Sequence, residues 1–181
     1  EACAEIESVT MDMWPAYIQA TEAHVPEASA KIAFDKFHVA QHLGEAVDKV
    51  RRGEHKTLMR EGDDSLKGTR YLWLRHPQAM SDRAWNVHFA HLRESTLKTA
   101  RAWAIKEAAM LLWDYRSRAW ARKAWQRWYQ WAIRSRLEPI KRVARMVKKH
   151  LDGIVTAVVL KATNAQAESI NGKIQRVKRL A

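Results

Sequence analysis

Extended segments are confined to the start of this chain, and this confinement limits what the rest can fold into. Residues 5–11, EIESVTM, read as a short strand that ends at Asp12, and KIAF reads as a second strand that ends at Asp35. WPAYIQATEAHV, between them, has a helical pattern, and a helix tolerates proline in its first turn. Strand, helix and strand in about 30 residues predict a βαβ unit with parallel strands and a right-handed crossover.

From Phe37 onward the pattern is helical. Apolar residues recur at helical spacing in FHVAQHLGEAVDKVRRGEHKTLM, and Ser81 is the expected N-cap of a later helix. A helical pattern then runs with few breaks from about Leu97 to His150, and a last helix starts at about Asn164. The predicted fold class is therefore α/β but mostly α.

The charge balance predicts a polyanionic partner. Lys and Arg number 32 against 20 Asp and Glu, so the formal net charge is +12. A surplus of this size favours nucleic acid or an anionic membrane surface. One cysteine, Cys3, excludes an internal disulfide and fits a cytoplasmic protein. No apolar run approaches the roughly 20 residues of a membrane span, and the N-terminus does not resemble a signal peptide.

Both ends of the sequence suggest a piece of a longer protein. The chain starts with Glu1 in place of Met, and it stops at QRVKRLA within a basic helical pattern that has no stop signal. We therefore expect further segments on either side.

A basic, tryptophan-rich block occupies residues 116–149, where twelve Lys or Arg residues accompany one acid, Glu138. Basic residues could bind a nucleic-acid backbone, and tryptophan faces could stack on unpaired bases. The competing interpretation is core packing by a helical stripe, for which the spacing selects Trp113, Trp120, Ala124, Trp128 and Trp131. Trp125 lies off that stripe and is the better candidate for a ligand contact. Arg122, Lys123 and Arg127 are the expected backbone contacts, and a membrane-binding helix ranks lower because the charge is spread around the helix.

The last helical pattern, TNAQAESINGKIQRVKR, carries one acid among amides. Glu168 lies four residues after Asn164 and three before Asn171, so the three share one face, which Gln175 extends. A cationic group follows: Lys173, Arg176, Lys178 and Arg179. The ordinary interpretation of Glu168 is a solvated side chain in intrahelical pairs, and the functional one is a metal ligand beside a phosphate backbone.

Asp12 and Glu168 gain a mechanism when they are taken together. Phosphodiester chemistry uses two divalent cations about 4 Å apart, which clamp the attacking and leaving oxygens. Mg²⁺ prefers carboxylate oxygens from separate rigid elements. A strand-end Asp and a helix Glu suit that requirement, but the residues alone leave Asp12 equally open to a role as a helix N-cap.

Three segments in this order carry a resemblance to a known family. MDMWPAYIQA, FDKFHVAQHLGEAVDKVRR and TNAQAESINGKIQRVKR resemble the transposases of the ISL3 group of bacterial insertion sequences. The resemblance covers essentially the whole chain. It implies a DDE-superfamily enzyme with an RNase H-like catalytic core.

The resemblance also implies roles for particular residues. Asp12 matches the second catalytic Asp and Glu168 the catalytic Glu, both as ligands of two Mg²⁺ ions, with Mn²⁺ as an alternative. Asp35 and His38, from DKFH, lie near the site. The position after Glu168 is often Gly in this group and is Ser169 here. The first catalytic Asp and the region that recognises the terminal inverted repeats are expected upstream.

The domain organisation implied by the resemblance has three parts. Residues 1–38 form a strand–helix–strand segment of the core, residues 39–162 a helical insertion, and residues 163–181 the core helix with Glu168. The implied reaction frees a 3′-OH by attack of metal-activated water, and that 3′-OH then attacks target DNA. The expected partners are DNA, as terminal inverted repeats and target DNA, and further copies of the chain in a homo-oligomer. The expected location is the bacterial cytoplasm, in association with the nucleoid.

Alternatives remain for the histidines and for the activity. His38 could be buried beneath the site, or could bind zinc together with His42 and Asp35, although no cysteine lies nearby. His88 and His91 are expected to be surface or packing residues. A catalytically inactive DNA-binding remnant is one competing function, because this chain without the upstream Asp is not expected to cut DNA. An RNase H-like nuclease outside transposition is another, and it would share the site but not the helical insertion.

Overall fold

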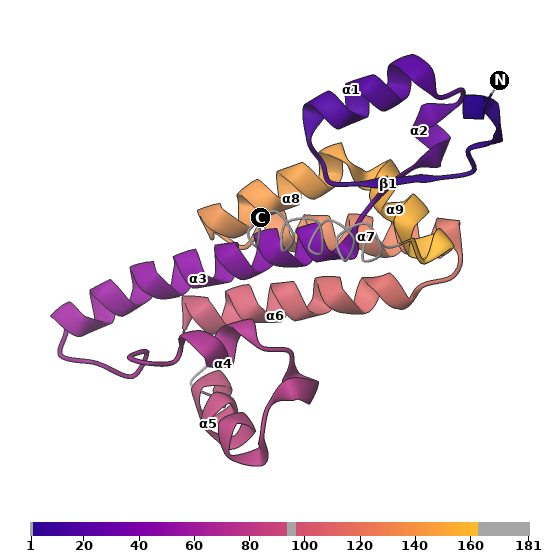
Figure 1. Cartoon of the computed structure of the whole chain (residues 1–181). Coiled ribbons are helices and arrows are strands. Elements are labelled where there is room, and N and C mark those ends of the chain that lie inside the picture. Colours follow the sequence, from indigo (N-terminus) through magenta and orange to yellow (C-terminus); the bar gives the residue numbers. More distant parts are fainter. Residues whose placement is uncertain (1, 94–96, 163–181) are drawn as a thin grey trace, which may run out of the picture. The chain divides into compact units, whose positions relative to one another are not determined.

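The computed structural model describes residues 2–93 and 97–162, and within them it is mostly helical with one two-stranded sheet (Figure 1). These residues form two compact units. The strand-bearing unit comprises residues 2–38, 114–122 and 150–162, and the helical unit comprises residues 39–113 and 123–149. The mostly helical α/β character is thus confirmed, and the RNase H-like core stays a prediction.

The sheet consists of β1 (Val9–Met11) and β2 (Ile32–Phe34), which run parallel and pair Val9 with Ile32 and Met11 with Phe34. In sequence, α1 (Pro15–His24) and α2 (Ala28–Lys31) lie between them. This confirms the predicted order and the parallel pairing. The first strand is shorter than expected, because η1 (Ala2–Glu5) is a 3₁₀ helix and β2 offers only three residues for pairing.

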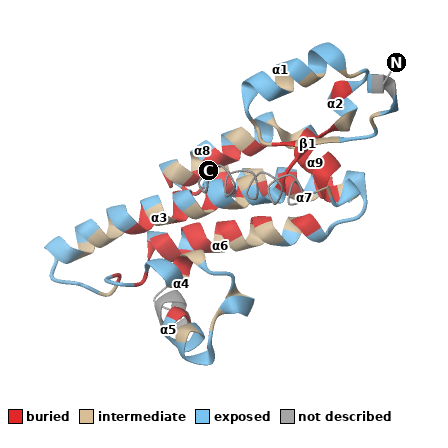
Figure 2. Ribbon diagram, viewed as in Figure 1, coloured by how far each residue is buried: buried red, intermediate tan, exposed pale blue. Residues whose placement is uncertain are grey.

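The sheet is covered by α9 (Leu151–Leu160), which contacts both β2 and α2. All three residues of β2 and residues 153–158 of α9 are buried (Figure 2). The rings of Phe34 and His150 also meet edge to face, with centroids 5.0 Å apart. A helical segment that is buried on all sides belongs to a core, and residues 153–158 form the core of the strand-bearing unit.

Gly153 allows the backbone of α9 to approach β2 closely. A Cβ atom at this position would lie 2.4 and 2.5 Å from Cδ2 and Cε2 of Phe34, and 3.3 Å from the carbonyl oxygen of Ile32. Contacts this short are not tolerated, so any side chain at position 153 would push the helix and the strand apart.

The helical unit is built around α3 (Lys36–Arg60), whose first residues belong to the strand-bearing unit. The predicted apolar spacing is confirmed, because Val39, Leu43, Val47 and Val50 are all buried. These residues form one stripe along the helix, and the opposite face is polar.

A carboxylate of α3 caps α6 (Lys98–Leu111). Residue 97, just before α6, is a leucine and provides no side-chain cap. Instead, Glu54 accepts hydrogen bonds from the backbone N–H groups of Lys98 and Thr99, each at 2.7 Å, and from the Thr99 hydroxyl at 2.6 Å. A negative charge at a helix N-terminus is favourable, so this contact between distant segments stabilises both helices.

Two short elements, α4 (Arg70–Leu74) and η2 (Pro77–Ala79), lead to α5 (Asp82–Arg93). The expected N-cap is confirmed, since the Ser81 hydroxyl accepts a hydrogen bond from the Ala84 N–H at 3.3 Å. The capped helix starts at the residue that follows Ser81.

His88 is a packing residue of α5, as expected. It is fully buried, and its ring centroid lies 4.7 Å from that of Trp73 and 4.5 Å from that of Trp103. Edge-to-face contacts of this kind stabilise an aromatic core beyond the area that they bury. The side chain of His91 lies outside the described residues.

The tryptophan stripe is partly wrong. Trp113 and Trp128 are buried, but Trp120 and Trp131 are 60% and 44% exposed, and Trp125, expected to face outward, is fully buried. The reason is a helix break. η3 (Leu112–Asp114) precedes α7 (Arg118–Ile133), so spacing counted from Trp113 through a continuous helix selects the wrong face.

The buried face of α7 follows the spacing Ala121, Trp125, Trp128 and Ala132. The Trp125 ring packs edge-on against Trp113 and Trp128, at 5.7 and 5.5 Å between centroids. The Trp128 indole N–H donates to a backbone carbonyl of α6 at 2.8 Å. α8 (Glu138–Lys149) follows and buries its own apolar face.

The close approach at Gly153 yields a stability prediction. In a helix interior, alanine is normally more stable than glycine by about 1 kcal/mol. Gly153→Ala should nevertheless lower the free energy of unfolding by about 1–3 kcal/mol, because the new methyl group collides with Phe34. Gly53→Ala is the matched control, since a Cβ atom there meets nothing within 4 Å, and it should be neutral or stabilising. Urea denaturation of both variants measures the difference. Equal effects at the two glycines would contradict the close packing.

Candidate active site

Two aspartates lie at the carboxyl edge of the sheet. Asp12 and Asp35 each follow the last residue of a strand, and the Asp35 backbone N–H donates to the Met11 carbonyl at 3.3 Å. Since Met11 pairs with Phe34 in a parallel ladder, the register brings both aspartates to the same edge. Open parallel sheets place ligands and chemistry at this edge.

The backbone fixes both carboxylates, in different ways. Asp12 is half-buried, and its Oδ1 accepts a hydrogen bond from the Trp14 N–H at 3.0 Å. Because Trp14 itself is the N-cap of α1, Asp12 forms an Asx turn before the helix and is not its cap. The alternative of Asp12 as an N-cap is therefore wrong for this helix.

Asp35 has the capping role instead. It is buried, it directly precedes α3, and its Oδ1 accepts from the N–H of Phe37, the second residue of that helix, at 2.8 Å. This is the geometry of an N-cap. Asp12 and Asp35 are thus neighbours. Only Asp35 uses a carboxylate oxygen to cap a helix.

His38 lies in the first turn of α3, close to this edge. It is half-buried, and its ring is 5.7 Å from that of Phe37, which is exposed. Within residues 2–93 and 97–162, no group of three or more His, Cys, Asp and Glu side chains is placed to hold a metal ion. The zinc set of Asp35, His38 and His42 is accordingly not assembled.

The remaining predicted site residues of the last helix lie outside the described residues. These are Asn164, Glu168, Asn171, Lys173, Arg176, Lys178 and Arg179. The meeting of Asp12 and Glu168 therefore stays a prediction.

The predicted DNA contacts on α7 differ in how accessible they are. Lys123 and Arg127 are exposed, whereas Arg122 is half-buried and forms an ion pair with Asp152 of α9. Trp125 is corrected: its ring is packed between other tryptophans and is not accessible to a base. The exposed tryptophans of this stretch are Trp120 and Trp131, both of which the expected stripe had placed in the core.

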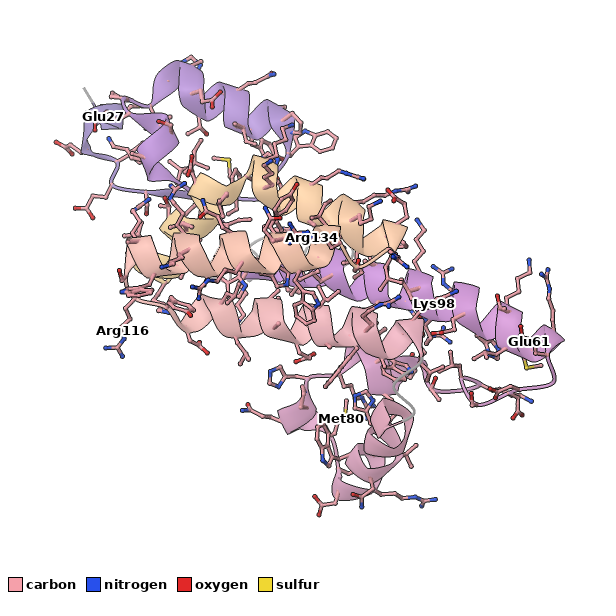
Figure 3. The ribbon with its side chains drawn as sticks, turned by 180° about the vertical axis from the view of Figure 1, so that it is seen from behind. Glu27, Glu61, Met80, Lys98, Arg116 and Arg134 are labelled. Atoms are coloured by element: carbon pink, nitrogen blue, oxygen red, sulfur yellow. The ribbon has the colours of Figure 1, made fainter. Side chains whose placement is uncertain are left out.

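The one acid of the basic block is held by its neighbours. Glu138 accepts a hydrogen bond from Arg145 at 2.9 Å and forms an ion pair with Lys141 at 2.9 Å. The Arg145 hydrogen bond, followed by that of Lys141, lowers the pKa of Glu138 to about 2. Other cations of the block remain exposed, such as Arg116, which points away from the ribbon before α7 (Figure 3).

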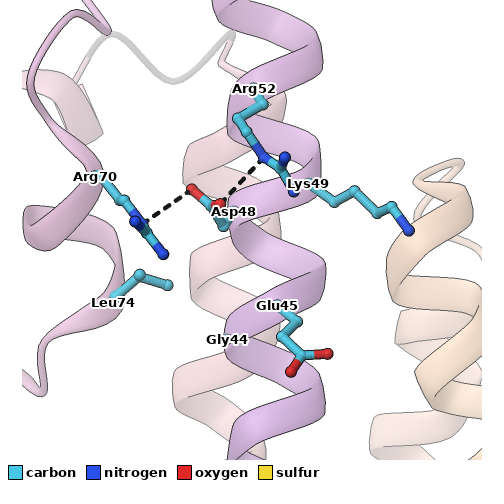
Figure 4. Close-up of a pocket in the computed structure, with 7 residues that line it drawn as sticks. All are labelled: Gly44, Glu45, Asp48, Lys49, Arg52, Arg70 and Leu74. Atoms are coloured by element: carbon cyan, nitrogen blue, oxygen red, sulfur yellow. Dashed lines mark ion pairs between the residues drawn. The ribbon is translucent and has the colours of Figure 1, made fainter.

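Sequence reasoning missed a second charged site, in the helical unit. Asp48 of α3 forms an ion pair with Arg51 at 2.9 Å. It also forms ion pairs with Arg52 at 3.1 Å and, from α4, with Arg70 at 3.8 Å (Figure 4). The helical spacing of DKVRR indicates the first two pairs. The third joins separate elements, and no local pattern predicts it.

Comparison with known proteins adds a family relationship. A family model described as a transposase, DDE_Tnp_ISL3, matches residues 1–181. The chain is 31% identical over 99% of its length to the transposase for insertion sequence element IS1001 from Bordetella parapertussis. It is 24% identical over its whole length to the transposase for insertion sequence element IS1557 from Mycobacterium tuberculosis.

The chain spans 44% and 45% of the length of these relatives. No solved structure matches it. In the part of the chain that the structure describes, every helix is too short or too polar to cross a membrane.

The capping role of Asp35 can be tested by its two simplest substitutions. Asp35→Ala removes the acceptor of the Phe37 N–H and should lower the free energy of unfolding by about 1 kcal/mol or more. Asparagine is as good an N-cap as aspartate, so Asp35→Asn should lose clearly less. Thermal or urea unfolding measures both. An equal loss in the two variants would show that the cap is not the important contact.

Proposed function

Because the chain belongs to the ISL3 family of transposases, we propose that it forms part of the catalytic domain of a DNA transposase. Its substrates are the terminal inverted repeats of an insertion sequence and target DNA. The reaction is cleavage at the ends of the element, followed by strand transfer. The observation that carries this proposal is the place of Asp12, at the carboxyl end of a parallel strand and beside Asp35.

Asp12 and Glu168 are the residues that would hold divalent metal. The donor chemistry fits, because Asp12 is a half-buried carboxylate at a sheet edge and Mg²⁺ prefers carboxylate oxygens that leave room for water. When bound, two Mg²⁺ ions supply activation of water and stabilisation of charge on the attacking and leaving oxygens. Mn²⁺ has the same ligand preference.

The residues around Asp12 hold it in position. The Trp14 N–H fixes one carboxylate oxygen by a hydrogen bond, and the adjacent α1 starts at Pro15, whose ring restricts the backbone. Asp35 anchors the start of α3 and thereby positions His38 near the same edge. A carboxylate held in this way loses little conformational freedom when it binds a ligand.

We propose that the catalytic core is RNase H-like and that a helical insertion interrupts it. Residues 39–113 and 123–149 group into one unit, and its described part, without residues 94–96, contains no strand, which supports an insertion. It favours narrower limits than residues 39–162, because residues 114–122 and 150–162 group with the strands. α9 then belongs to the core, and the chain continues from it towards Glu168.

The basic residues would hold DNA through its phosphates. Lys123 and Arg127 are exposed on α7, and Lys173, Arg176, Lys178 and Arg179 follow Glu168 in sequence. Arg122 contributes less, since its charge is partly balanced by Asp152. Contacts of this kind position a duplex without reading its sequence.

The catalytic assignment predicts a separation of cleavage from binding. In the full-length protein, Asp12→Asn or Glu168→Gln should lower Mg²⁺-dependent cleavage of insertion-sequence ends by at least about a thousandfold, because a metal ligand is lost. DNA affinity should change little. Asp64→Asn, in an exposed loop, removes the same charge and should leave cleavage unchanged. A gel assay of 3′-end formation measures the rates. Normal cleavage by either site variant, or no cleavage by the unaltered protein, would refute the assignment, and the second result favours an inactive DNA-binding remnant.

The exposed cations of α7 predict a change in salt dependence. Lys123→Gln with Arg127→Gln should reduce the slope of log K against log salt concentration by about 1.8, because each phosphate contact releases about 0.9 counterion. The affinity at about 0.1 M salt should fall roughly 60-fold by the same relation. Fluorescence anisotropy with a DNA duplex measures both. Arg60→Gln with Arg83→Gln, two exposed cations elsewhere, should leave the slope nearly unchanged, and an equal loss in both pairs would exclude a specific contact by α7.

A further inference from the structure

We propose that a pocket between α3 and α4 binds a phosphate of the DNA backbone, with Arg52 and Arg70 as donors and Asp48 as the residue that aligns them. The inference rests on the proposed function, because it assumes a protein that acts on DNA. The pocket has a volume of about 330 Å³ and lies within the helical unit (Figure 4). Its lining consists of Gly44, Glu45, Asp48, Lys49, Arg52, Arg70 and Leu74.

Three arginines converge on one carboxylate. Arg51 makes two hydrogen bonds to Oδ1 of Asp48, at 3.0 and 2.9 Å, and both side chains are nearly buried. This pair already satisfies a buried charge with a buried partner. Arg51 alone therefore balances the charge of this carboxylate, and the further two arginines exceed it.

Arg52 and Arg70 form ion pairs with the same carboxylate. Each meets Asp48 through its Nε atom, at 3.1 and 3.8 Å, and their side chains are 65% and 57% exposed. A guanidinium carries four more N–H donors on its terminal nitrogens, in a planar fork that matches phosphate. One carboxylate thus pairs with two arginine forks, Arg52 at Oδ2 and Arg70 at Oδ1, and both arginines line the pocket.

The charge of the cluster calls for an anion. Asp48 contributes one negative charge and the three arginines three positive charges, so the group carries a net charge of +2. Lys49 adds a further cation to the lining. The other acid, Glu45, accepts a hydrogen bond from Gln41 at 3.1 Å and adds one negative charge, so the net charge with Lys49 and Glu45 included is again +2. Asp48 offsets only part of this positive charge, so a further anion at the arginines would be attracted.

A DNA phosphate is the anion that fits best. Arginine forks bind phosphate bidentately, and they contact the backbone without regard to sequence. Gly44 lacks a side chain and leaves room at one wall of the pocket, where a Cβ atom would lie 3.9 Å from Leu74. The net charge of +12 favours the approach of a polyanion to the protein as a whole.

The test uses the full-length protein and fluorescence anisotropy with a DNA duplex of arbitrary sequence, at several salt concentrations. Arg52→Gln with Arg70→Gln should lower the salt slope by about 0.9 and the affinity at about 0.1 M salt roughly eightfold, as expected for one lost phosphate. Each single variant should show most of this decrease in slope and affinity, because both forks hold the same phosphate. Both side chains are exposed, so the variants should fold normally, and circular dichroism checks this.

The controls separate the possible outcomes. Arg60→Gln with Arg83→Gln removes the same charge outside the pocket, and a slope equal to that of the pocket variant would overturn the proposal. Calorimetry with inorganic phosphate tests a second outcome. If the double variant loses phosphate binding but its salt slope for DNA stays unchanged, the pocket binds a free anion and the proposal is overturned. Absence of DNA binding by the unaltered protein would instead refute the proposed function on which the inference rests.

Discussion

The strand-bearing unit depends on the contact between α9 and β2 at Gly153. A parallel pair of three-residue strands has too few hydrogen bonds and too little apolar area to be stable alone. Helix α9 supplies the missing area, and it can do so only because its backbone reaches the Phe34 ring where a side chain would collide. Asp12 and Asp35 immediately follow the paired residues, so their positions depend on this contact.

The two aspartates then acquire different tasks from their local hydrogen bonds. Both accept a hydrogen bond from the backbone N–H two residues ahead, but only the donor of Asp35 belongs to a helix. Asp35 is therefore needed for the start of α3, and Asp12 ends a strand without terminating any helix. The division explains why a catalytic role is proposed for Asp12 and a supporting one for Asp35, although their sequence contexts are alike.

The parts of the fold that the sequence predicts are those set by local patterns. The strand-end aspartates, the Ser81 cap and the apolar stripe of α3 each follow from a few neighbouring residues, and all are confirmed. The burial of Trp125 could not be predicted, because a short break at residues 112–117 changes the phase of the next helix. Within the described residues, the cap of α6 by Glu54 was equally hidden, since it joins positions more than 40 residues apart.

The ion pairs distinguish cations whose charge is balanced by an acid from cations whose charge is not. Arg122 is balanced by Asp152, while Arg145 and Lys141 are balanced by Glu138. At Asp48 the balance is reversed, because one carboxylate serves three guanidinium groups and two of them remain exposed. One arginine balances this carboxylate, and Arg70 in addition joins α4 to α3. The additional pair has a physical reason if a second anion, supplied by the ligand, completes the cluster.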